Sequence, residues 1–110
     1  MNGLSPLALS ADELAVVKAI LVRHVPEASV WVFGSRATGK AKKYSDLDLC
    51  IKANQALGLD LMSAMAEDFS DSDLPWKVDI VDWFSVSDSF KAIIERDSVP
   101  LFLSGVDPTT

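Results

Sequence analysis

Three aspartates and a glycine-serine pair have the types and spacing that could do chemistry. Asp46 and Asp48 lie two positions apart in "SDLDLCI", so on a β-strand both side chains would point to the same side. Two carboxylates held that close repel each other unless a cation lies between them. Hard divalent cations, above all Mg²⁺, take oxygen ligands and are held by a few carboxylates together with substrate phosphates. The pair therefore predicts a magnesium site that also binds phosphate.

A third carboxylate is expected from the segment "WKVDIVDW", which is β-branched and apolar enough to be a strand. Asp79 stands between Val78 and Ile80. Burying a charge among apolar residues costs free energy, so this position suggests that the side chain faces a functional site. Asp82 lies near the end of the same segment, where solvent can reach it. We expect Asp79 to complete a two-metal site, with Asp82 as the alternative.

Gly34 and Ser35 follow the apolar run "VWVF" and begin a basic connection. A glycine lets the backbone approach a ligand without a Cβ in the way, and Ser35 offers a hydroxyl together with backbone amides for phosphate oxygens. The stretch "GSRATGKA" also nearly matches a P-loop. Ala41, however, has no oxygen for the metal, and a strand rather than a helix follows. We therefore reject the P-loop interpretation.

The elements that must position these residues follow from hydrophobic periodicity and turn residues. A helix is predicted over 11–24, because Ser10 and Glu13 form a capping box and apolar residues recur at helical spacing. The predicted strands are 29–33, 46–53 and 76–83. Further helices are predicted within 56–69 and over 87–97, the latter capped by Ser85 or Ser87, and the tail from Val99 is left unassigned. We expect one α/β domain over 1–110, with a short mixed sheet, helices packed on one side and the site near Ser35.

The charge of the chain limits its partners. Sixteen acidic and ten basic side chains give a net charge of −6, which repels a nucleic-acid backbone over most of the surface. Four basic residues nevertheless cluster after the glycine-serine pair, where they suit a small polyanion: Arg36, Lys40, Lys42 and Lys43. A single cysteine and the lack of a long apolar run predict a cytoplasmic protein without a membrane span. The oligomeric state stays open.

Taken together, "FGSRATGKAKKYSDLDL" and "KVDIVDW" resemble the minimal nucleotidyltransferases of the DNA polymerase beta superfamily. That family carries Gly-Ser, a spacer, Asp-x-Asp on the next strand and another acidic residue on a later strand. The resemblance covers about residues 30–83. It implies Mg²⁺-dependent transfer of a nucleoside monophosphate, from ATP as the expected nucleoside triphosphate, to an acceptor hydroxyl.

The resemblance also implies residue roles and a partner. The metal-binding and catalytic set would be Asp46, Asp48 and Asp79, and the nucleotide-binding set would be Gly34, Ser35, Arg36, Lys43 and Ser45. Family members of this size often act beside a small all-helical protein of the HEPN class, as an antitoxin that adenylylates a HEPN ribonuclease. Two alternatives remain: a binding module that blocks its partner by contact alone, and a nucleotidyltransferase that modifies small molecules of the antibiotic kind.

Overall fold

A four-stranded sheet forms the centre of the computed structural model, which describes residues 9–42 and 44–102. The strands are β1 (Ser29–Phe33), β2 (Leu47–Lys52), β3 (Val78–Asp82) and β4 (Val99–Phe102). Their order across the sheet is β3-β2-β1-β4. β1 is antiparallel to both β2 and β4, whereas β2 and β3 run parallel. The predicted mixed sheet is therefore confirmed.

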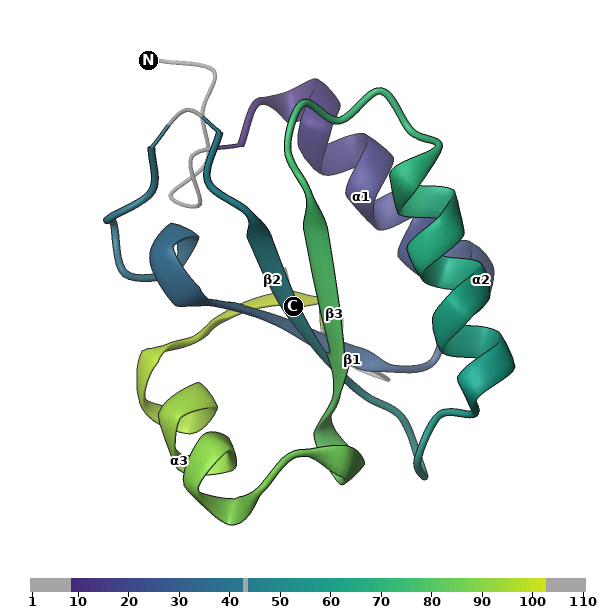
Figure 1. Cartoon of the computed structure of the whole chain (residues 1–110), viewed down its shortest axis with the longest axis vertical. Coiled ribbons are helices and arrows are strands. Elements are labelled where there is room, and N and C mark those ends of the chain that lie inside the picture. The colour runs from purple at the N-terminus through teal and green to yellow at the C-terminus, as the bar shows by residue number, and fades with distance from the viewer. Residues whose placement is uncertain (1–8, 43, 103–110) are drawn as a thin grey trace.

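Two helices, α1 (Ala11–His24) and α2 (Leu59–Ser70), cover one face of the sheet and lie side by side at the right of Figure 1. The predicted capping box begins α1: Ser10 Oγ accepts from Glu13 N, and Glu13 Oε1 accepts from Ser10 N. Alternating strand residues point into the core beneath the helices. Those that are fully buried are Val30, Val32, Leu47, Leu49 and Ile51.

The opposite face of the sheet is covered only in part, by α3 (Asp88–Asp97) and a 3₁₀ turn at Trp83–Ser85. Ser87 caps α3, so of the two predicted caps the later one is used. Trp83 packs against Trp31 with ring centroids 6.5 Å apart. Phe90 of α3 meets Phe33 edge to face at 5.4 Å. α3 lies at the lower left of Figure 1.

The fourth strand, β4, lies in the tail that the sequence left unassigned. Its segment "VPLF" contains Pro100, which cannot donate a backbone hydrogen bond and therefore argues against a strand in local terms. The structure places β4 at the edge of the sheet, paired with β1 across an irregularity in register. An edge position tolerates a proline because one side of the strand needs no partner. No helix within the described residues is long and apolar enough to cross a bilayer.

Candidate active site

The register between two parallel strands brings the predicted carboxylates together. Asp48 of β2 is aligned with Asp79 of β3, and aligned residues of neighbouring strands project to the same face of a sheet. The backbone N–H of Leu47 donates to the carbonyl of Lys77 at 2.9 Å, so the pairing continues toward Asp46. Asp48 and Asp79 thus lie at one end of the sheet, on the face opposite α1 and α2, and Asp46 lies directly before β2 at the same end.

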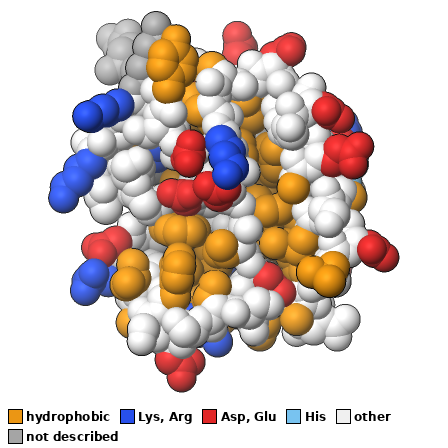
Figure 2. Space-filling model, in the orientation of Figure 1, with side chains coloured by type: hydrophobic (Ala, Val, Ile, Leu, Met, Phe, Trp, Pro, Cys, Tyr) orange, Lys and Arg blue, Asp and Glu red, His pale blue; other side chains and the backbone are white. Residues whose placement is uncertain are grey.

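The pKa of Asp48 reflects its burial and its closeness to the other two carboxylates. Burial raises the pKa of Asp48 above its ordinary value, and the charges of Asp79 and Asp46 raise it further. Each of these effects disfavours the ionised carboxylate, and a bound cation would reverse the last two. Figure 2 shows acidic side chains gathered near the centre of the view, with a basic side chain against them.

Gly34 brings the end of β1 against Asp48. Its φ of 77° lies in the left-handed region, and a Cβ built on it would lie 2.3 Å from Oδ2 of Asp48. A side chain at this position would therefore overlap the carboxylate. Gly34 and Ser35 open a single 3₁₀ turn, Gly34–Arg36, and among the described residues 37–42 and 44–46 no α-helix follows before β2. This agrees with the sequence analysis, which rejected a P-loop because a strand rather than a helix was expected after this turn.

Arg36 connects this turn to the acidic strand. Its side chain is buried, with 2% of the residue exposed. Nε and Nη2 donate to the carbonyl oxygen of Ser45 at 3.2 and 2.8 Å, and the guanidinium carbon lies 4.5 Å from the ring centroid of Trp76. Burial lowers the pKa of Arg36, whereas the charges of Glu13 and Asp46 raise it. The geometry is that of a brace between the turn and the residue before Asp46.

The other predicted phosphate contacts lie around the same loop. Ser45 Oγ accepts from the backbone N–H of Lys42 at 2.7 Å, so this hydroxyl also shapes the connection. Lys40 and Lys42 are exposed. Lys43 lies outside the described residues.

Asp82, the alternative third carboxylate, has a different environment. It is 5% exposed, and it aligns with Ile51 on the helix-covered face. Its carboxylate accepts from Leu57 N at 2.8 Å, from Phe84 N at 3.0 Å and from Ser85 Oγ at 3.2 Å. These bonds cap the 3₁₀ turn and anchor the loop before α2. Of the two candidates, Asp79 is the one that faces Asp48.

Lys77 is a residue of this site that the sequence analysis missed. Its Nζ lies 3.4 Å from Oδ1 of Asp79, and both side chains are substantially exposed. The sequence could have predicted this contact, because the spacing Lys-x-Asp on a strand puts both side chains on one face. No group of three His, Cys, Asp or Glu side chains within residues 9–42 and 44–102 is arranged as a finished metal site. In this structure Asp79 is paired with Lys77.

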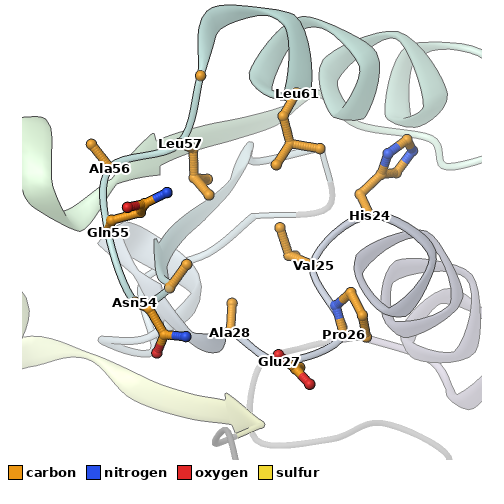
Figure 3. A pocket seen from close by; sticks show the side chains of 12 residues that line it. His24, Val25, Pro26, Glu27, Ala28, Asn54, Gln55, Ala56, Leu57 and Leu61 are labelled. Atoms are coloured by element: carbon orange, nitrogen blue, oxygen red, sulfur yellow. The ribbon is translucent and has the colours of Figure 1, made fainter.

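A pocket of about 580 Å³ lies at the other end of the sheet (Figure 3). It opens between the C-terminal end of α1, with His24 and Pro26, and the loop that carries Gln55 and Leu57. This loop follows the C-terminal end of β2, whereas Asp48 lies near the start of β2. His24 is hydrogen-bonded to Asp68 of α2 at 2.5 Å. The pocket is thus separate from the three carboxylates.

Comparison with known proteins identifies the family. The model of the nucleotidyltransferase domain matches residues 14–103. The chain belongs to the nucleotidyltransferase family. This nucleotidyltransferase is 48% identical over 96 residues to the probable protein adenylyltransferase MntA of Haemophilus influenzae, covering 87% of this chain and 84% of that protein.

Solved structures show the same fold for this nucleotidyltransferase. A chain from the crystal structure of a toxin-antitoxin with AMP-PNP matches with a TM-score of 0.72 and 22% identity, over 84% of this chain and 74% of that one. A chain from the complex of tri-AMPylated Shewanella oneidensis HEPN toxin with its MNT antitoxin matches with a TM-score of 0.65 and 22% identity, over 83% and 70%. The resemblance predicted from the sequence motifs is confirmed.

Proposed function

We propose that this nucleotidyltransferase transfers AMP from ATP to a hydroxyl of a HEPN-type partner protein and so serves as the antitoxin of a cytoplasmic pair. The observation that carries the proposal is the position of Asp48, which lies between Gly34, the residue directly after β1, and Asp79 on β3. This arrangement offers one side for the phosphates of the nucleotide and another for the acceptor.

The donor set suits Mg²⁺. The ion prefers carboxylate ligands, and the site offers those of Asp46, Asp48 and Asp79. The raised pKa of Asp48 is due in part to repulsion by the other two carboxylates, which a bound cation would reduce. We assign these three residues as the ligands. Bound magnesium would neutralise charge on the triphosphate and favour departure of pyrophosphate.

Residues of the protein would bind the phosphates, position the turn and accept the proton of the acceptor hydroxyl. The turn at Gly34 and Ser35 would hold the outer phosphates, and Arg36 with Ser45 would keep that turn at a fixed distance from the acidic strand. The acceptor hydroxyl attacks the α-phosphorus, and the bond from that phosphorus to the bridging oxygen of the β-phosphate breaks. Pyrophosphate leaves with the electron pair, while the proton of the hydroxyl passes to Asp79.

The proposed partner comes from the relatives. The similar Haemophilus influenzae protein is described as a probable protein adenylyltransferase, and the Shewanella oneidensis complex pairs an MNT antitoxin with a tri-AMPylated HEPN toxin. The 48% identity to the first of these supports the same kind of acceptor here. We therefore favour a helical HEPN-type protein over a small molecule.

A labelling experiment tests the proposal. The chain is incubated with α-³²P-ATP, Mg²⁺ and the HEPN-type protein encoded by a neighbouring gene, as wild type, as Asp48→Asn and as Asp60→Asn. Asp60 is an exposed carboxylate in the first turn of α2 and serves as the control. We expect label on the partner with wild type and Asp60→Asn, and at least a hundredfold less with Asp48→Asn.

Two other results would contradict the proposal. Neutralisation of the partner without any label would mean that the chain acts by contact alone. Label on an aminoglycoside, with none on the partner, would mean a small-molecule acceptor.

A further inference from the structure

A groove lies between residues 76–80, which include the first half of β3, and the C-terminal half of α2. We infer that this groove binds the acceptor polypeptide as an extended segment, with the reactive hydroxyl placed beside Asp79. The inference rests on the proposed function, because it names the surface by which the same site recognises its acceptor.

The groove has a volume of about 460 Å³. Its walls are mainly apolar, with Ala66 and Phe69 from α2, Leu74 from the following loop and Ile80 from β3. Lys77 and Asp79 also line it, so the groove and the carboxylate site share residues. In Figure 2, hydrophobic side chains show between the central acidic group and the helices on the right.

The direction of the reaction assigns this side to the acceptor. In a phosphoryl or nucleotidyl transfer, the attacking oxygen and the leaving oxygen lie roughly in line on opposite sides of the phosphorus. The strand order β3-β2-β1 puts Gly34 and Asp79 on opposite sides of Asp48. If the turn at Gly34 and Ser35 holds the leaving phosphates, the attacking hydroxyl must arrive from the side of β3, where the groove lies.

The edge of β3 favours an extended occupant. Within the part of the chain that the structure describes, β3 pairs with β2 and with no other strand. Its outer edge therefore presents backbone N–H and C=O groups that an added strand could bond. The five residues of β3 span about 17 Å, long enough for a short peptide segment. The apolar walls suit an apolar side chain next to the hydroxyl-bearing residue, and Lys77 suits an acidic one.

A pair of substitutions on one helix tests the groove. Ala66→Trp places a large side chain in the groove, whereas Ala64→Trp places the same side chain at an exposed position of α2 outside the groove lining. Each variant is assayed with α-³²P-ATP, Mg²⁺ and the HEPN-type partner, and ATP binding is followed by the rise in Tm that it causes. We expect Ala66→Trp to lower kcat/KM for the partner at least tenfold, mainly through KM, with ATP binding unchanged. Ala64→Trp should stay within twofold of wild type.

Hydrogen exchange separates this inference from the proposed function. The partner should slow exchange at residues 78–82 of the wild type and have little effect on the same amides of Ala66→Trp. If wild type transfers no label but the partner still protects β3, the proposed function fails and the docking surface stands. If transfer occurs and Ala66→Trp behaves as wild type, the inference is wrong while the function stands. Protection confined to α2, or no protection at all, would also overturn the extended geometry.

Discussion

The carboxylate of Asp48 lies against the backbone of Gly34, so closely that a Cβ on Gly34 would be 2.3 Å from Oδ2. Real Cβ contacts are essentially never that short. The end of β1 and the acidic residue of β2 can therefore adjoin only because position 34 has no side chain. This contact joins the turn proposed for phosphate to a proposed metal ligand.

Gly34→Ala and Gly39→Ala together separate this contact from backbone strain. Both glycines have positive φ, 77° and 78°, but no atom of the described residues lies within 4 Å of a Cβ on Gly39. We expect Gly39→Ala to cost roughly 1–2 kcal/mol of unfolding free energy, from the left-handed backbone alone. Gly34→Ala should cost more and should also reduce nucleotide transfer at least tenfold, because the methyl displaces Asp48. Urea unfolding and the labelling assay measure these effects, and equal losses in both variants would contradict the steric explanation.

Asp79→Ala and Asp82→Ala should have opposite consequences. The Asp79 side chain is 42% exposed, so its removal should leave stability within about 1 kcal/mol and abolish transfer. Loss of the Asp82 carboxylate leaves the backbone N–H groups of Leu57 and Phe84 without that acceptor, at a cost of roughly 1–3 kcal/mol for each group that stays unpaired. Thermal unfolding and label transfer distinguish the two. Loss of activity in a well-folded Asp82→Ala protein would reassign the third carboxylate.

Arg36→Met tests whether the buried guanidinium is a brace or a phosphate contact. Met retains much of the apolar contact with Trp76 but removes both donors to the Ser45 carbonyl. We expect a loss of roughly 1–3 kcal/mol in unfolding free energy, measured in urea, while Lys42→Met at an exposed position changes it by less than about 0.5 kcal/mol. A variant that keeps full stability yet loses ATP binding would support the direct phosphate contact that the sequence predicted.

Asp48→Asn should raise the Tm of the metal-free protein at pH 7. The pKa of Asp48 is raised in the folded state by burial and by Asp79 and Asp46, so the folded protein holds the proton more tightly than the unfolded chain. Stability contributed by this group therefore falls as pH rises from the unfolded pKa through the folded pKa. Asparagine removes that penalty, and its advantage should shrink as the pH is lowered from 7 toward 4. Thermal unfolding in EDTA measures the difference, and a constant or reversed difference would contradict the assignment.

Local sequence patterns determined most of the elements of this protein. Helix 11–24 and strand 29–33 have the predicted bounds, because a capping box and a β-branched run ended by glycine are signals carried by neighbouring residues. The grouping of Asp46 and Asp48 also follows from short-range spacing, whereas the family was indicated by a resemblance of motifs over residues 30–83. β4 could not be predicted in this way, because the pairing that stabilises it comes from β1, about seventy residues earlier. In addition, Pro100 argues against a strand when only neighbouring residues are considered.

The tertiary structure decided which of these residues face one another. Asp79 and Asp82 look alike in "VDIVD", yet an odd spacing of three positions puts them on opposite faces of β3, and only the register with β2 identifies Asp79 as the neighbour of Asp48. From the sequence, Arg36 is an accessible cation directly after the glycine-serine pair, but in the structure it is buried, with contacts to Trp76 and to the Ser45 carbonyl. Alternation and charge are local properties of a chain, whereas register and burial depend on segments that meet only after folding.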